Sequence, residues 1–302
     1  MIPEPAAAIL GNVAFDIICY PVDDVPRSSS MTFEKAVISP GGCGSNSAIG
    51  LAALGIPTAL IACIGDDIPG LLAMQYWHEF GVDTRFIHKL PASTTGVSVG
   101  LVDHEAQPRF VHTTGANQFL NASSIPVETL LNANLRAFHI AGYFLMPGLL
   151  EPELAAKLTQ LQAAGVFVTL DVQQTPRMSQ PEMLWTILPI LDAFLCNANE
   201  AALITGAAAP AEAVKVFLEH GAKHVIIKLG ERGCLLASEQ INRTIPAPLV
   251  NVVDTTGAGD AFAAGLIYSI IHGAELVEAC EFANQVGAKM VTTLGAVEAW
   301  RD

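Results

Sequence analysis

The sequence predicts an α/β fold in which helices cover a mostly parallel central sheet and a small β flap sits at its edge. Two observations lead to this prediction. From about residue 130 onward, short apolar runs alternate with helical stretches, which is the pattern of a parallel sheet covered by helices. In the first half, two polar segments of extended character interrupt that alternation. With 302 residues, the chain can bury a full core as one large domain or as two.

The apolar runs of the second half are expected to be strands. They lie at 136–145, 166–172, 192–197 and 224–230, with a helical stretch from Glu151 to Ala164 between the first two. Residues 233–238 and 241–247 are expected to form an antiparallel hairpin at the sheet edge. The chain is then expected to be helical from Ala258 to about Val291.

Two segments of the first half, which we call the lid, stand apart from this pattern. Residues 13–39 hold the loop PVDDVPRSSS between extended stretches, and residues 95–115 contain TGVSVGLVD and PRFVHTT around a polar turn. These stretches could pair as a small sheet. Because they leave and rejoin the main pattern, we expect a flap inserted in one domain of residues 1–302 instead of a second domain.

Composition narrows the possible partners. Hydrophobic residues make up 51% against 15% charged and the mean hydropathy is +0.44, which suggests an apolar surface covered by a second subunit. The net charge of −14 opposes the phosphate neutralisation on which nucleic-acid binding depends. An anionic ligand would therefore have to be held locally, by helix N-termini and backbone amides.

Cysteine usage and hydropathy indicate the compartment. The six cysteines show no C-x-x-C spacing, which fits a reducing cytoplasm. The first residues lack a basic region, and the longest apolar run is too short and too interrupted by Pro and Gly to span a bilayer. We expect neither export nor membrane insertion.

The segment VDTTGAGDAFAAGLIYSII, residues 253–271, carries the strongest chemical signal. The small-residue turn Thr256–Gly259 runs into an apolar helix, so free N–H groups and the positive helix end face one point that suits an anion. Asp260 lies beside it, and a carboxylate next to an anion hole suits phosphoryl transfer to a hydroxyl. The helix end is expected to lower the pKa of Asp260. An ordinary capped helix is the alternative.

The segment SPGGCGSNSAIGLAALG, residues 39–55, is a Gly-rich loop that opens a helix expected from near Ser45 to before Gly55. Gly41 and Gly42 permit close backbone approach, and Asn46 can offer both a donor and an acceptor to a polyol. Neither the dinucleotide fingerprint G-x-G-x-x-G nor a P-loop is present. An ordinary strand-to-helix connection is the alternative.

These two segments, in this order and about 210 residues apart, resemble the signatures of the ribokinase-like (PfkB) carbohydrate kinase family. The stretch LGNVAFDII looks like the family's first strand, NANE at 197–200 like its N-x-x-E motif, IKLGERGCLL like its nucleotide-side turn, and FANQVGAKMVTTLGA like its closing segment. The resemblance covers nearly the whole chain. It implies a ribokinase-like three-layer sandwich with a β-sheet lid, and an ATP-dependent kinase.

The resemblance also implies roles for single residues. Asp260 would be the base that takes the proton from the acceptor hydroxyl, and the anion hole for the transferring phosphoryl group would be formed by Gly257, Ala258 and Gly259. The substrate hydroxyls would be held by Asp16, Gly41, Gly42 and Asn46. A purely structural role for a buried Asp16 is the alternative.

On the nucleotide side, the resemblance implies that Asn197 and Glu200 organise Mg²⁺ through water; the alternative is that they cap the helix beginning near Ala198. ATP would be lined by Lys228 and by Gly230 to Gly233, with Asn284 near the adenine or, alternatively, simply a polar position on the last helix. A monovalent cation such as K⁺ would be bound by Asp254, Thr256 and the region from Met290 to Gly295.

The chain departs from ribokinases proper at two places. Ala14 stands where they have an Asn, and the Tyr143–Leu145 stretch stands where an acidic residue follows the strand. We therefore expect a substrate with an apolar face, such as a nucleoside or a differently oriented hexose, against an aromatic wall at Tyr143. The loop GGCGSN carries no basic residue to clamp a phosphate, so we expect the substrate to be unphosphorylated. The only nearby lid cation candidates are Arg109 and His112. Arg109 could contact substrate or be solvated.

In the family the lid closes over the sugar, which excludes water, and in several members it also pairs two subunits. A homodimer through the lid is therefore expected here. The competing functions are a catalytically silent sugar or nucleotide sensor on the same scaffold, and a dehydrogenase. The intact GAGD turn argues against the sensor, and the missing dinucleotide fingerprint argues against the dehydrogenase.

Overall fold

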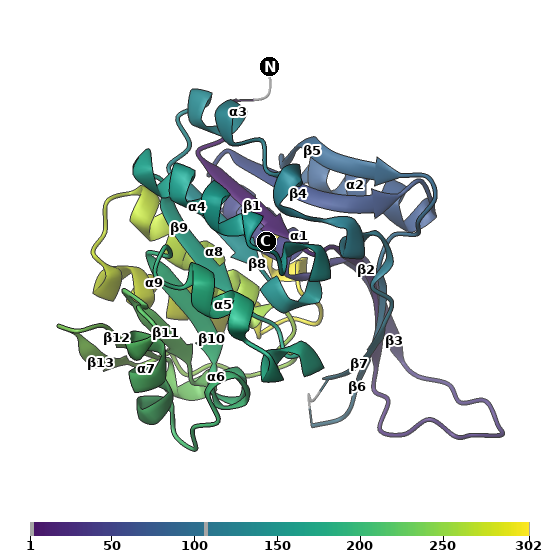
Figure 1. The fold of residues 1–302 in the computed structure, drawn as a ribbon. Coiled ribbons are helices and arrows are strands. Elements are labelled where there is room, and N and C mark those ends of the chain that lie inside the picture. The colour runs from purple at the N-terminus through teal and green to yellow at the C-terminus, as the bar shows by residue number, and fades with distance from the viewer. Residues whose placement is uncertain (1–2, 106–107, 302) are drawn as a thin grey trace.

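Within residues 3–105 and 108–301, which the computed structural model describes, nine strands form the central sheet in the order β13-β12-β11-β10-β9-β8-β1-β4-β5 (Figure 1). Their bounds are β1 (Ala7–Gly11), β4 (Thr58–Gly65), β5 (Asp83–Leu90), β8 (Ala137–Ala141), β9 (Phe167–Asp171), β10 (Ala193–Asn197), β11 (Val225–Lys228), β12 (Cys234–Ala237) and β13 (Asn242–Ile245). All neighbouring pairs are parallel except those made by β12, which is antiparallel to β11 and β13. The expected edge hairpin is therefore confirmed.

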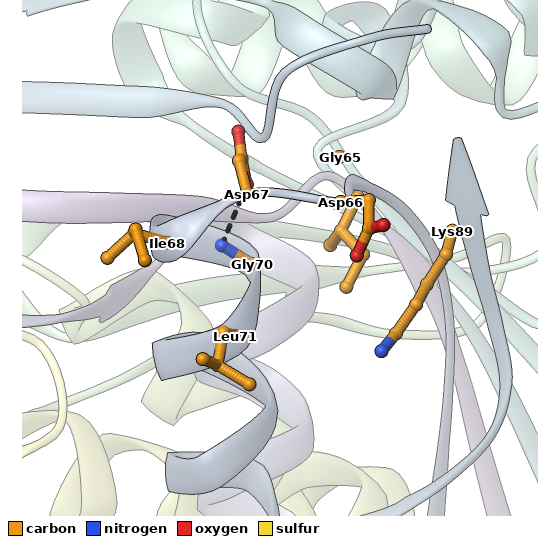
Figure 2. A pocket seen from close by; sticks show the side chains of 8 residues that line it. Gly65, Asp66, Asp67, Ile68, Gly70, Leu71 and Lys89 are labelled. Carbon is orange, nitrogen blue, oxygen red and sulfur yellow. Dashed lines mark hydrogen bonds between the residues drawn. The ribbon is translucent and has the colours of Figure 1, made fainter. Parts of the chain in front are cut away.

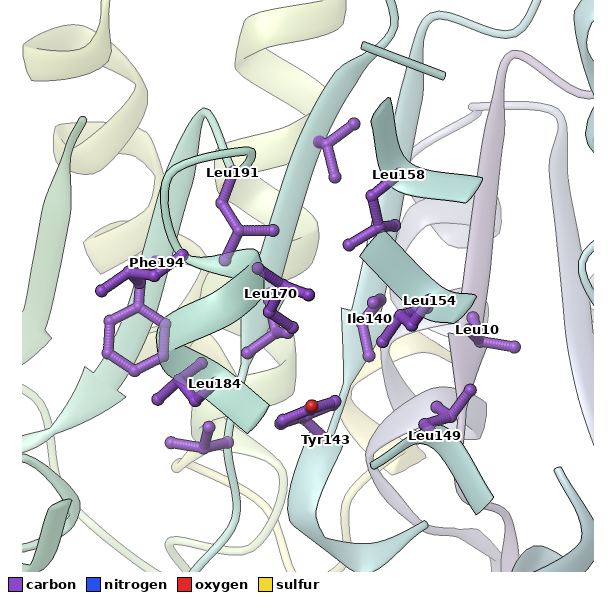
Figure 3. Packing of buried hydrophobic residues seen from close by; sticks show 14 of the residues in the cluster. Leu10, Ile140, Tyr143, Leu149, Leu154, Leu158, Leu170, Leu184, Leu191 and Phe194 are labelled. Atoms are coloured by element: carbon purple, nitrogen blue, oxygen red, sulfur yellow. The ribbon is translucent and has the colours of Figure 1, made fainter. Parts of the chain in front are cut away.

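Helices cover both faces of this sheet. One face carries α3 (Val127–Asn132), α4 (Glu153–Ala163), α5 (Glu182–Ile187), α6 (Ala198–Thr205) and α7 (Pro210–Glu219); the other carries α1 (Cys43–Ala53), α2 (Ile68–Glu79), α8 (Ala258–Ile271) and α9 (Leu276–Met290). Strand β1 shows why: Leu10 packs into the cluster of the first face (Figure 3), and its neighbour Ile9 packs into the cluster of the second. The predicted α/β sandwich is confirmed.

Short 3₁₀ turns join several of these elements. They lie at Gly115–Phe119, Ala122–Ser124, Tyr143–Leu145, Pro147–Leu149, Pro176–Ser179, Gly230–Arg232 and Glu298–Trp300.

Two helix boundaries differ from the sequence-based expectation. The region expected to be helical from Ala258 to about Val291 is helical but consists of two helices, because α8 ends at Ile271 and α9 begins at Leu276. Gly273 has a φ of 86°, a left-handed conformation that ends helices. The Gly-rich loop also enters its helix early, since α1 begins at Cys43 instead of near Ser45.

The lid forms a second sheet that projects from the body (Figure 1). Its strands are β2 (Ala14–Tyr20), β3 (Lys35–Gly41), β6 (Val97–Val102) and β7 (Pro108–His112), in the order β3-β2-β6-β7. Ile18 and Val102 of this sheet pack against Leu294, in the last loop of the body. One face of the lid sheet is thereby turned toward the body.

In the described part of the chain, no single helix has the length and apolar character to cross a bilayer; the bent pair α6 and α7 meets those two criteria only when both helices, 52° apart, are taken together.

Candidate active site

The turn before α8 is fixed by one buried carboxylate. Asp254 accepts hydrogen bonds from the backbone N–H (2.9 Å) and hydroxyl (2.7 Å) of Thr256 through Oδ1, and from the Gly295 N–H (2.9 Å) through Oδ2. Gly257 follows with a φ of 76°, and a Cβ there would lie 2.7 Å from Ala296 Cβ. The Ala258 N–H donates to the Thr255 carbonyl oxygen (3.3 Å). The other N–H groups of the first turn, which a helix leaves without an intrahelical partner, are the ones available to an anion at this point.

Asp260 lies half-buried in the first turn of α8. Its Oδ2 accepts a hydrogen bond of 2.8 Å from Asn46 Nδ2, which joins the start of α1 to the start of α8. Burial and the negative charge of Asp171 raise the pKa of Asp260 to about 7, against the opposing effects of the Asn46 hydrogen bond and Lys228. The expectation of a lowered pKa is therefore wrong, because desolvation outweighs the helix end.

The second carboxylate of the site, Asp16, belongs to the lid strand β2 and is only 6% exposed. A Cβ at Gly41 would overlap its carboxylate, so the glycine makes room for the acid. Burial raises the pKa of Asp16 to about 7, and a hydrogen bond from Ser98 offsets this only in part. Gly42, with a φ of 85°, then turns the chain into α1 and brings Asn46 into the site.

Two buried oxygen atoms of this site are free to accept a hydrogen bond. Among the described residues, neither Asp16 Oδ1 nor Asn46 Oδ1 has a hydrogen-bond partner. Burying an unpaired polar oxygen is costly unless a ligand satisfies it. A molecule with hydroxyl donors would do so, and Asn46 would place it against Asp260.

Lys228, the last residue of β11, brings a positive charge to the same point. Its Nζ would lie 2.9 Å from a Cβ at Gly259, so the ammonium rests over the first turn of α8. Burial alone would lower the pKa of Lys228, but the charges of Asp171, Glu200 and Asp260 outweigh it and raise the pKa. The site therefore holds a protonated Lys228 next to the first turn of α8.

Asp171 and His139 were not predicted from the sequence. Asp171 ends β9, is 2% exposed, and accepts the Gly142 N–H at 2.7 Å through Oδ1. Its Oδ2 lies 3.7 Å from Nε2 of His139, whose Nδ1 is 2.8 Å from Thr169 Oγ1. Burial would raise the pKa of Asp171, but His139 and Lys228 hold it lowered. The only sequence signal for this pair was a single acidic residue, Asp171, at the carboxyl end of an expected parallel strand, which is where ligands bind in such sheets.

Asn197 and Glu200 form the helix cap that the sequence left open as an alternative. Asn197 Oδ1 accepts the Glu200 N–H (2.9 Å) and Glu200 Oε2 accepts the Asn197 N–H (2.7 Å), at the start of α6. Burial raises the pKa of Glu200. Among the described residues, no group of three His, Cys, Asp or Glu side chains is arranged to hold a metal ion.

The expected aromatic wall is wrong. Tyr143 is 1% exposed and packs in the core beside Phe144, as Figure 3 shows for the tyrosine. Gly142, with a φ of 73°, turns the chain into a 3₁₀ helix directly after β8. That turn carries both rings back under the sheet instead of toward the site.

Two other candidate side chains are engaged in structural hydrogen bonds. Arg109 Nη2 donates to the carbonyls of Val22 and Asp23, both at 2.7 Å, and so holds the long lid loop. Asn284 Nδ2 donates to the carbonyls of Ile245 (3.0 Å) and Pro246 (3.3 Å), where β13 ends.

The turn between β11 and β12 depends on two glycines. Gly230 and Gly233 have φ values of 63° and 85°, and a Cβ at Gly233 would overlap the Ile245 carbonyl oxygen. The positive φ values, and at Gly233 also the lack of room for a Cβ, favour glycine at both positions.

A hollow of about 430 Å³ lies elsewhere, at the carboxyl end of β4 (Figure 2). Its lining residues are Ile64, Gly65, Asp66, Asp67, Ile68, Gly70, Leu71 and Lys89. Asp67 caps α2 by accepting the Gly70 N–H (3.0 Å) and also binds the Thr95 N–H (2.8 Å), just before β6. The hollow shares no lining residue with the cluster around Asp260, and Asp67 serves there to anchor the lid.

Comparison with known proteins places the chain among sugar and nucleoside kinases. A model of the pfkB family of carbohydrate kinases matches residues 7–302. Aminoimidazole riboside kinase of Salmonella typhimurium is 30% identical over 294 residues (92% of this chain, 88% of that protein), and ribokinase of Haemophilus influenzae is 28% identical (95% and 92%). An Escherichia coli structure in complex with ATP and Mg²⁺ superposes with a TM-score of 0.81 at 26% identity, covering 98% of this chain and 95% of that one.

Proposed function

The chain belongs to the pfkB family of carbohydrate kinases, and from that premise we propose that Asp260 is the general base of its phosphoryl transfer. The enzyme is a phosphotransferase that uses ATP to phosphorylate a hydroxyl group of a sugar or nucleoside. The observation that carries the assignment is the position of Asp260. Its carboxylate, with a pKa of about 7, lies in the first turn of α8, and the ammonium of Lys228, from the end of β11, lies next to that turn.

The reaction is a direct transfer from ATP to an unphosphorylated sugar, polyol or nucleoside. Asp16 and Asn46 hold the acceptor through the two unpartnered oxygens, which leaves one hydroxyl facing Asp260. Asp260 accepts that proton, the acceptor oxygen bonds to the γ-phosphorus, and the bond from phosphorus to the β,γ-bridging oxygen breaks to release ADP. The N–H groups at Gly257 to Gly259 and the ammonium of Lys228 counter the charge on the transferring group.

Magnesium would enter with ATP on the side of β10 and β11. Asn197 and Glu200 would contact it through water, since their cap hydrogen bonds already fix both side chains. The Gly230–Gly233 turn would run along the phosphates and ribose, and Asn284 would lie near the adenine.

Asp254 fits a K⁺ site. It is fully buried, yet forms no ion pair within the described residues, so a bound cation would neutralise it. Thr256 and carbonyl oxygens near Gly295, whose N–H already binds Asp254, would complete the coordination.

The lid would pair two subunits. On the face turned away from the body, the register aligns four apolar side chains in one row: Ile38, Ile17, Val99 and Val111. Ile38 is 52% exposed and Val111 65%. A second copy of the lid would cover this apolar row. The six cysteines are free and buried, and we place the enzyme in the reducing cytoplasm.

Acceptor-dependent ADP release tests the function. The purified protein is incubated with MgATP and, one at a time, pentoses, hexoses, sugar acids and nucleosides. At least one unphosphorylated acceptor is expected to raise ADP release well above the rate with ATP alone. ATP binding without acceptor-dependent release from any member of the panel would support the silent sensor instead.

A further inference from the structure

The body-facing side of the lid sheet carries two rows of side chains that the strand register lines up. The first row contains Ser39, Asp16, Ser98 and His112, and the second contains Val37, Ile18, Gly100 and Phe110, each from β3, β2, β6 and β7 in turn. Residues paired across neighbouring strands share a face of the sheet. Asp16, the acceptor ligand, is therefore aligned with a histidine on the outermost strand.

Contacts fix which side of the sheet this is. Ile18 packs against Leu294 of the body. A Cβ at Gly100 would lie 2.6 Å from Ile18 Cδ1 and 2.8 Å from Phe110 Cε1, so those two side chains meet over the glycine. Phe110 is thus on the same side as Asp16, beside His112.

The chemistry changes along the first row. Asp16 and Ser98 are buried and polar, suited to hydroxyl groups. On the edge strand, His112 is exposed and Phe110 is 43% exposed, and within the described residues neither ring contacts another aromatic ring. A buried polar centre is followed by an exposed aromatic edge.

The spacing sets the size of the matching ligand. Neighbouring strands lie about 4.8 Å apart, so His112, two strands from Asp16, is about 10 Å away along the row. A single sugar ring held by Asp16 does not extend that far. A planar ring attached to the sugar would reach the aromatic edge.

We propose that the acceptor is a riboside, with its sugar on Asp16 and Ser98 and its planar heterocycle stacked on Phe110 and His112, which are specificity-determining residues. This rests on the proposed kinase function and names its substrate class. The aromatic contact with the substrate, which was expected at Tyr143, is thereby assigned to Phe110 and His112 of the lid.

Acceptor selectivity tests the inference. ADP release is measured with adenosine, inosine, uridine and aminoimidazole riboside, and with free ribose and fructose as matched acceptors without a heterocycle. Wild type is expected to show at least a tenfold higher kcat/KM for one riboside than for either free sugar. Phe110→Ala and His112→Ala should each lower that riboside's kcat/KM about 5- to 100-fold, mainly through KM, because a stacking surface is lost.

The control variant is Phe110→Tyr, which keeps the ring and should keep the selectivity for the riboside. Free-sugar turnover should change less than twofold in all three variants, whereas a misfolded lid would lower every acceptor alike. A wild type that prefers ribose or fructose, or alanine variants that lose both acceptor classes equally, would overturn the inference while leaving the kinase function in place. If none of the acceptors supported ADP release, the kinase function itself would be overturned, and the inference with it.

Discussion

Replacing Asp16 by Asn should make the protein more stable and less active. Burial raises the pKa of Asp16 from 3.8 to about 7, so the native state binds this proton more tightly than the unfolded chain does. The free energy of unfolding of the wild type therefore falls as pH rises from about 4 to about 7 and levels off above that. The side-chain amide of the Asp16→Asn variant does not titrate in this range, so this part of the decline disappears.

The size of the effect follows from the pKa difference. The pKa of Asp16 differs by about three between the native and unfolded states, and each pKa unit corresponds to 1.36 kcal/mol. The Asp16→Asn variant can therefore gain at most about 4 kcal/mol in free energy of unfolding at pH 8. Relaxation around the carboxylate and the changed hydrogen bond to Ser98 reduce the expected gain to about 2 kcal/mol. Urea unfolding of both proteins at pH 4.5, 6 and 8 measures it. A stability difference that stays constant across these pH values would refute the reasoning.

Three further changes test separate parts of the site. Gly41→Ala should lower kcat/KM for the acceptor at least tenfold with KM for ATP nearly unchanged, because the new Cβ must displace the Asp16 carboxylate; a normal acceptor KM would contradict this. Lys228→Met should lower kcat about 10²-fold, because it removes the ammonium over the first turn of α8. Steady-state kinetics at saturating ATP measures this change, and an unchanged kcat would show that Lys228 does not take part in the transfer step. Ile38→Asp should convert a dimer to monomers in sedimentation velocity, because it places a charge in the apolar outer row of the lid; a dimer that persists would place the interface elsewhere.

The fold was predictable because its signals are local. Alternating apolar and helical stretches gave the parallel sheet, and the polar interruptions gave the lid. The glycine loops were predictable too, since Gly42 and Gly257 adopt positive φ values at the starts of α1 and α8. Asp260 and Asn46 were expected in one site, and a hydrogen bond joins them across 214 residues of sequence.

What the sequence did not predict depends on the path of the chain in space. Gly142 adopts a left-handed conformation, so Tyr143 enters the core where a wall of the site was expected. Asp171 and His139 stand on separate strands and have no shared motif, so only strand pairing brings them together. The raised pKa of Asp260 reflects burial and the charge of Asp171, neither of which a local pattern contains.

The central claim, that Asp260 is the base, is tested most directly by single substitution to Asn, which keeps the shape of the side chain but cannot accept the proton. With saturating MgATP and the best acceptor of the panel, we expect Asp260→Asn to lower kcat about 10²- to 10⁴-fold while ATP affinity stays within a few-fold of wild type. A variant that turns over at close to the wild-type rate would show that another group takes the proton.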